Sequence, residues 1–124
     1  MKTNIKATGL DLTPALRAYV EEKLAHVERF IDPSDESVLV DIEIGKTSQH
    51  HHSGEVFKAE VNLHISGGNF YASTEEADLY AAIDVVKDEI ISVIKTNKAK
   101  KNTLLRRGGR QIKRMLRGIN PWKK

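Results

Sequence analysis

The sequence predicts an α+β fold, a four-stranded sheet with two helices packed on one face, in the order βαβββα. Two observations predict it. Residues 38–44 and 57–65 alternate apolar and polar side chains with the period of a strand, whereas residues 14–31 and 73–101 carry apolar side chains at helical spacing. Because each apolar stripe must be buried, one mostly antiparallel sheet covered on a single face is the compact arrangement.

The first 35 residues are predicted to form a strand and then a helix. Residues 2–8 alternate loosely, which favours a short strand. Thr13 and Pro14 are typical of a helix start, because a hydroxyl caps the first turn and proline is tolerated at the first helical position. The segment Asp32-Pro33 is expected to end the helix, since a residue before proline avoids helical geometry. Its apolar face comprises Leu16, Tyr19, Val20, Leu24, Val27 and Ile31.

Three strands are predicted in the middle of the chain. Residues 38–44 and 57–65 point their apolar side chains to one side, and a polar loop too long for a tight hairpin joins them. Asp41 and Glu43 face outward in this arrangement. The turn at 66–69 leads into a last short strand at 70–72.

The stretch 73–101 is predicted to be the helix that organises the fold. Ser73 and Glu76 form a capping-box pattern at its start. The apolar face predicts that the first half packs on the sheet, and beyond Ile94 the sequence contains no acidic residue. We therefore expect the last turns to present positive charge. The apolar face comprises Leu79, Ile83, Val86, Ile90 and Ile94.

Charge is distributed unevenly along the chain. Residues 1–94 contain 8 Lys and Arg and all 17 Asp and Glu, whereas residues 95–124 contain 12 Lys and Arg and no acid. Such a block is typical of an arm that meets phosphates or an anionic membrane surface. The alternative is a basic tail kept in solvent for solubility.

Length and composition predict one domain at 1–101 and a basic amphipathic tail at 102–124. The chain has no cysteine, which excludes a disulfide, a thiolate metal site and a cysteine nucleophile. The first residues lack the apolar core of a signal peptide, and no apolar run is long enough to span a membrane. A cytoplasmic location is expected.

The end of the second helix is a candidate nucleic-acid surface. Lys87, Lys95 and Lys98 fall on one flank, where they could follow a phosphate backbone. A solvated flank is the alternative for three lysines alone. Nucleic acid is favoured by the bases that continue the row, namely Lys100, Lys101, Arg106 and Arg107.

The tail at 109–122 has three interpretations. Ile112, Met115, Leu116 and Ile119 share a helical face, and Trp122 follows them. A basic amphipathic helix binds RNA, a protein partner or a membrane surface. We favour RNA, then a protein partner, then a membrane. The bases of this tail are Arg110, Lys113, Arg114 and Arg117.

No cofactor or metal is expected, and the chain does not resemble an enzyme. His50–His52 invite a metal hypothesis, but consecutive histidines do not converge easily on one ion, so a loop facing solvent or RNA is favoured. The serines lack the spacing of a catalytic triad. The paired glycines at 67–68 and 108–109 lack the pattern of a phosphate-binding loop.

Three segments resemble one protein family. They are TPALRAYVEEKL (13–24), HHSGEVFKAEVNLHI (51–65) and DLYAAIDVVKDEI (78–90). Over about residues 1–101 the chain is similar to the ribosome hibernation promoting factors, a family that includes the ribosome-associated inhibitor A proteins and was once called the sigma-54 modulation proteins. The run Asp-Leu-Tyr-Ala-Ala-Ile-Asp is the most specific part.

The resemblance implies a fold similar to double-stranded RNA-binding domains and a non-enzymatic role. Family members sit on the small subunit of the 70S ribosome, in the channel used by mRNA and tRNA, and inhibit translation by blocking it under stress or in stationary phase. No DNA partner is implied. The implied contacts to 16S rRNA are Arg17 and Lys23 on the first helix and Lys87, Lys95, Lys98, Lys100 and Lys101 on the second.

Two departures from the family pattern stand out. Family members commonly carry bases and a glutamine through the middle of the second helix, where this chain has Glu89-Ile90-Ile91-Ser92-Val93. Only 23 residues follow Lys101, too few for the dimerisation domain of long members, so we expect a short form. We expect the tail to add affinity by binding 16S rRNA or a ribosomal protein. A general double-stranded RNA-binding protein or RNA chaperone remains the alternative.

Overall fold

The computed structural model of the chain describes residues 1–47 and 55–106, with side chains up to residue 100. This part of the chain forms four strands and two helices in the predicted order, which confirms the α+β fold. The elements are β1 (Lys2–Thr8), α1 (Pro14–Glu28), β2 (Leu39–Lys46), β3 (Phe57–Ile65), β4 (Gly68–Glu76) and α2 (Leu79–Arg106).

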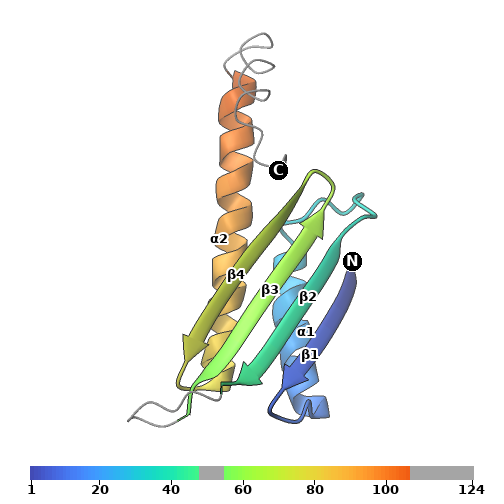
Figure 1. Cartoon of the computed structure of the whole chain (residues 1–124). Helices are drawn as coiled ribbons and strands as arrows, with labels where there is room; N and C mark the ends of the chain where they lie inside the picture. Colours follow the sequence, from blue (N-terminus) through green and yellow to red (C-terminus); the bar gives the residue numbers. More distant parts are fainter. Residues whose placement is uncertain (48–54, 107–124) are drawn as a thin grey trace.

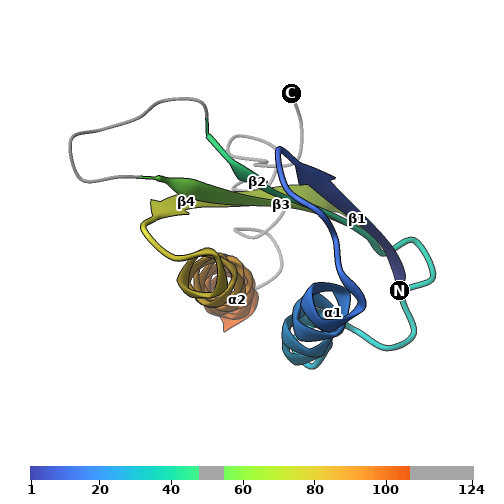
Figure 2. The same cartoon turned by 90° about the horizontal axis from the view of Figure 1, so that it is seen from below.

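The four strands form one sheet in the order β1-β2-β3-β4. β1 and β2 are parallel, because α1 crosses between them, whereas β2–β3 and β3–β4 are antiparallel. Both helices cover the same face of the sheet, as predicted (Figure 2). Neither helix covers the opposite face, here called the open face.

The hydrophobic core lies between the sheet and the two helices. Alternate residues of the central strands are fully buried, as the period-two pattern predicts. The helices bury the side chains at helical spacing, and among the side chains of α2 described up to residue 100, Ile94 is the last that is buried. The last turns of α2 continue past the β3–β4 turn (Figure 1). The second helix therefore packs with its first half and projects with its second.

The prediction for the end of α1 was wrong by several residues. The helix ends at Glu28, ahead of Asp32-Pro33. Tighter turns follow: the N–H of Phe30 donates to the carbonyl of Val27, and that of Ile31 to the carbonyl of Glu28. Ile31 therefore packs against the core from outside the helix.

The boundary between β4 and α2 also differs from the prediction. Ser73 and Glu76 do not cap the helix, because residues 73–76 continue β4 and pair with β3. The last strand is thus longer than the predicted 70–72. Asp78 caps α2 instead, since its carboxylate accepts a hydrogen bond from the N–H of Ala81 at 3.0 Å.

A turn joins β3 and β4 where the sequence predicted one, but it is shorter than the predicted 66–69, because Gly68 and Asn69 belong to β4. Ile65 pairs with Gly68, which leaves Ser66 and Gly67 as a two-residue loop. Gly67 has a φ of 91°, a left-handed conformation that glycine adopts without strain.

Candidate nucleic-acid interface

The two helices meet along a line of aromatic and charged side chains, here called the helix seam: Tyr19, Lys23 and Phe30 from α1 and the turn after it, and Tyr80, Asp84, Lys87, Lys95 and Lys98 from α2. Early residues of α1 meet early residues of α2, and later residues meet later ones. The rings of Tyr19 and Tyr80 pack edge to face at 4.8 Å, and Lys95 Nζ lies 5.0 Å from the Phe30 ring centroid. The helices therefore run parallel (Figure 1).

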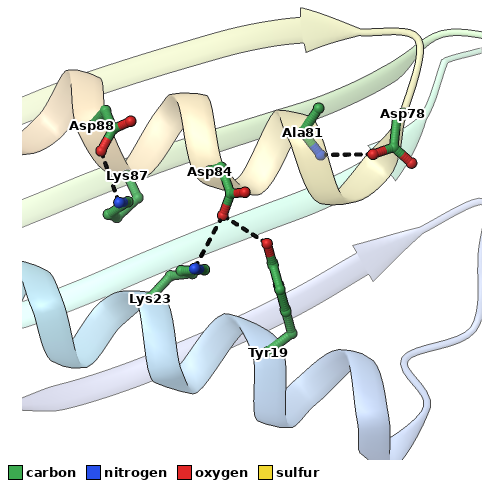
Figure 3. Close-up of polar contacts among 7 residues, drawn as sticks. All are labelled: Tyr19, Lys23, Asp78, Ala81, Asp84, Lys87 and Asp88. Atoms are coloured by element: carbon green, nitrogen blue, oxygen red, sulfur yellow. Dashed lines mark hydrogen bonds and ion pairs between the residues drawn. The ribbon is translucent and has the colours of Figure 1, made fainter.

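Asp84 is the centre of the first part of the helix seam. Its Oδ1 accepts a hydrogen bond of 2.7 Å from the Tyr19 hydroxyl and lies 3.4 Å from Lys23 Nζ (Figure 3). The same ammonium lies 4.9 Å from the Tyr19 ring centroid, a cation–π contact. These contacts leave the Lys23 side chain only 19% exposed, so its charge is largely compensated within the protein.

Burial and the Asp84 carboxylate raise the pKa of Tyr19 to about 12. The neutral hydroxyl is thus favoured in the folded state, so its stabilising contribution is complete below pH 10 and is lost as the pH rises from 10 to 12. We expect one of the three tyrosines to ionise late when absorbance is followed at 295 nm. Asp84→Asn should lower the pKa of that tyrosine, though not to 10, because burial remains.

Asp88→Asn is the matched control for this titration, because Asp88 lies on the same helix and its side chain is 71% exposed. It should leave the tyrosine titration unchanged. An Asp84→Asn curve that coincides with the wild-type curve would refute the coupling between Tyr19 and Asp84.

The second part of the helix seam is more basic. Lys87 pairs with Asp88 at 2.7 Å (Figure 3). In the described part of the chain, no carboxylate lies within 4 Å of the ammonium groups of Lys95 and Lys98, although the charge of Lys98 still helps to lower the pKa of Asp32. Both lysines are exposed. Positive charge therefore becomes less compensated toward the projecting end of α2.

The structure brings some of the predicted site residues together and separates others. Lys23, Lys87, Lys95 and Lys98 share the helix seam. Lys100 lies on another side of α2, where it borders a hollow with Phe70. Arg17 is exposed on α1. Lys101 and Arg106 belong to α2, but their side chains are not described, and the predictions for Arg107, Arg110, Lys113, Arg114, Arg117 and the loop His50–His52 lie outside the described residues.

The sequence analysis did not predict the side chains that contact Lys23 and Lys95 in the helix seam. Tyr19 was assigned to the core, and Asp84 and Phe30 were given no role. Tyr19 and Asp84 are 65 residues apart, so their contact depends on how the helices pack. One sequence feature could have indicated this contact. Residues 19, 23, 26 and 30 are spaced by three or four, which places them in one row beside the buried face of α1.

The open face of the sheet has a different character. Asp41 and Glu43 face outward, as predicted: Asp41 accepts a hydrogen bond of 2.8 Å from Asn4, and Glu43 one of 2.8 Å from Thr8. Glu60 accepts from Tyr71 at 3.0 Å and pairs with Lys58 at 2.8 Å. Three carboxylates thus lie near the centre of this face, where Lys58 pairs with Glu60 and Lys6 lies opposite Glu43.

Two other kinds of site find no support in the described residues. Residues 1–47 and 55–106 contain no group of three or more His, Asp or Glu side chains placed to hold a metal ion. Nor does either described helix have the length and apolar character needed to cross a membrane.

Comparison with known proteins identifies the family. The family model described as sigma 54 modulation protein / S30EA ribosomal protein matches residues 3–102. The chain belongs to this family. A ribosome hibernation promoting factor of Azotobacter vinelandii is 41% identical over 90 residues, which cover 73% of this chain and 76% of that protein. One from Pseudomonas putida is 37% identical over 105 residues, covering 85% and 94%. The resemblance predicted from the sequence is confirmed.

Two solved structures share the fold. The N-terminal domain of Thermus thermophilus Protein Y superposes with a TM-score of 0.65 at 30% identity, covering 77% of this chain and 98% of that one. A ribosomal subunit interface protein of Coxiella burnetii gives a TM-score of 0.64 at 22% identity, covering 80% and 99%. At that identity the second likeness concerns the fold alone.

Proposed function

We propose that this protein is a non-enzymatic ribosome hibernation factor. It binds the small subunit through 16S rRNA and blocks the channel used by mRNA and tRNA. The observation that carries the proposal is the family match over residues 3–102, together with relatives named ribosome hibernation promoting factor. The chemistry of the surface agrees, because the helix seam offers exposed ammonium groups that can meet phosphates.

The helix seam is the surface that we propose for 16S rRNA. An RNA groove is held mainly by neutralising phosphates, and lysines that keep their charge uncompensated serve this best. Lys95 and Lys98 meet that requirement. Lys23 and Lys87 contact RNA only if phosphates compete with Asp84 and Asp88, so we expect these two lysines to contribute less. Arg17, which is exposed on α1, and Lys100, which lies on another side of α2, are outside the helix seam, so we expect them to add less to this contact.

The acidic centre of the open sheet face supports an oriented mode of binding. Asp41, Glu43 and Glu60 would repel RNA phosphates on this face, whereas the exposed Lys95 and Lys98 on the helix side would attract them. A protein charged in this way approaches the ribosome with its helices first. The proposed binding is therefore asymmetric and salt-dependent.

Sedimentation with purified ribosomes tests the proposal. The protein should pellet with small subunits and whole ribosomes but not with large subunits, and tRNA should displace it. Its share in the pellet should fall as the salt concentration rises, because each phosphate contact releases counterions. Binding to free double-stranded RNA as tight as binding to small subunits would favour a general RNA-binding protein instead. Failure to pellet with small subunits at low salt would refute the ribosomal role.

A further inference from the structure

A groove with apolar walls opens where α2 leaves the sheet, between α2, the β3–β4 turn and the segment after α1. We call it the end groove. Its hollow has a volume of about 650 Å³. Its size lies in the range of pockets that hold ligands or side chains of a partner. The apolar lining consists of Phe30, Ile31, Leu63, Ile65, Phe70 and Ile94.

Three carboxylates and one lysine line the end groove as well. Asp32, Asp35 and Glu36 come from the segment that joins α1 to β2, and Lys98 comes from α2. Hydrogen bonds from the backbone and hydroxyl of Ser34 lower the pKa of Asp32, and hydrogen bonds from the Ser37 hydroxyl and the Ser66 backbone lower that of Asp35. Both carboxylates therefore stay ionised at mildly acidic pH. The end groove combines an apolar floor with excess negative charge.

We propose that the end groove of the free protein binds the chain's own residues 107–124. This segment contains seven Lys and Arg and no acid, which complements the three carboxylates. It also carries apolar residues at helical spacing, which match the apolar lining of the groove. These residues are Ile112, Met115, Leu116 and Ile119, with Trp122 after them.

The connection is long enough for this docking. From Lys98, which lines the end groove, α2 continues for eight residues to Arg106, about 12 Å along the helix axis. Residues 107–111 include a glycine pair, and five extended residues reach back about 17 Å. Ile112 and the residues after it can therefore return to the groove of the same molecule.

A second hollow near the end of α2 fits this tail less well. It has a volume of about 360 Å³ and lies across α2, where Lys100 borders it with Phe70 and Val93. Its lining contains no Asp or Glu. The basic residues of 107–124 would meet a lysine there without a compensating carboxylate. Charge complementarity therefore favours the end groove over this second hollow.

Docking would make the tail and the helix seam interdependent. Lys98 belongs to both surfaces, and the tail bases that neutralise Asp32 and Glu36 in the free protein are the same bases expected to meet rRNA. Ribosomal phosphates would compete for the tail, so that docking and rRNA binding exclude each other at these residues. The docking itself needs no ribosome, so its test is independent of the proposed function.

Trp122 provides a direct probe of docking, because it is the only tryptophan in the chain. In the intact protein its emission should be blue-shifted and its quenching by acrylamide weaker than in concentrated urea. Glu36→Lys should reverse much of this shielding, because the variant replaces an attraction by a repulsion at an exposed position. We expect it to weaken docking about fivefold. Ile31→Ala should act in the same direction by removing apolar lining.

Glu21→Lys is the matched control, since Glu21 is an exposed acid on α1 that does not line the end groove. It should leave Trp122 shielded, and circular dichroism should report the same fold for all variants. A Trp122 as accessible in the wild type as in urea would overturn the proposal. So would shielding that Glu36→Lys and Ile31→Ala leave intact. Shielding that increases with protein concentration would assign the tail to the groove of a second copy and overturn docking within one chain.

Discussion

Replacing Lys95 and Lys98 together by alanine should weaken binding to the small ribosomal subunit by roughly tenfold or more at low salt, and should reduce the slope of log affinity against log salt by about two. Both ammonium groups lack a carboxylate within 4 Å in the described part of the chain, so neither must break an ion pair to meet a phosphate. Sedimentation or fluorescence titration across a salt series measures both quantities.

Lys2→Ala combined with Lys6→Ala is the control for that experiment. These exposed lysines belong to β1, away from the helices, and their removal changes the net charge by the same amount. Affinity should fall far less than for the α2 pair. Equal losses for the two double variants would mean that net charge alone drives binding, and would remove the argument for the helix seam.

The order of elements could be predicted from the sequence because each element carries its own periodicity. β3, with alternating residues from Phe57 to Ile65, was predicted with its observed bounds. The start of α1 was also correct, since Thr13 accepts the capping hydrogen bond from the N–H of Leu16 at 3.1 Å. In both cases the decisive signal, a period of two for β3 and the Thr13-Pro14 helix start for α1, lies within the segment itself.

The errors arose where distant contacts override a local pattern. Ser73 and Glu76 have the spacing of a capping box, but β3 is nine residues long and its partner strand extends to match it. The two-residue turn at Ser66-Gly67 and the buried alternate residues set that register, which places Lys58 opposite Glu75 and Glu60 opposite Ser73. The pairing of β4 with β3 therefore outweighs the capping-box pattern of Ser73 and Glu76, and Asp78 caps α2 instead.

The candidate site was predicted in part for the same reason. Helical spacing placed Lys87, Lys95 and Lys98 on one flank, and the structure puts that flank beside α1. Sequence spacing could not reveal which lysines are compensated, because that depends on Asp84 meeting Lys23 across two helices. The distinction matters for function, since an ion-paired lysine gives up one partner when it binds a phosphate.

Ile90→Ala should destabilise the fold by about 3 kcal/mol, because it removes a fully buried side chain and leaves a cavity between α2 and the sheet. Urea unfolding followed by circular dichroism measures this free energy. Glu89→Ala is the control at the adjacent position, where the side chain is exposed, and should change stability by only about 0.5 kcal/mol or less.

The two substitutions also separate stability from binding. Glu89 is an exposed carboxylate on α2 that would repel phosphates, so Glu89→Ala should preserve or increase ribosome affinity while leaving the fold intact. Ile90→Ala should lower stability without changing the salt dependence of ribosome binding by the folded protein, because it alters no charge.

A small loss of stability for Ile90→Ala, comparable to that for Glu89→Ala, would contradict the placement of Ile90 in the core. A loss of affinity for Glu89→Ala would contradict its assignment as a residue that repels phosphates. Adjacent positions on one helix thus test its packed side and its charged side independently.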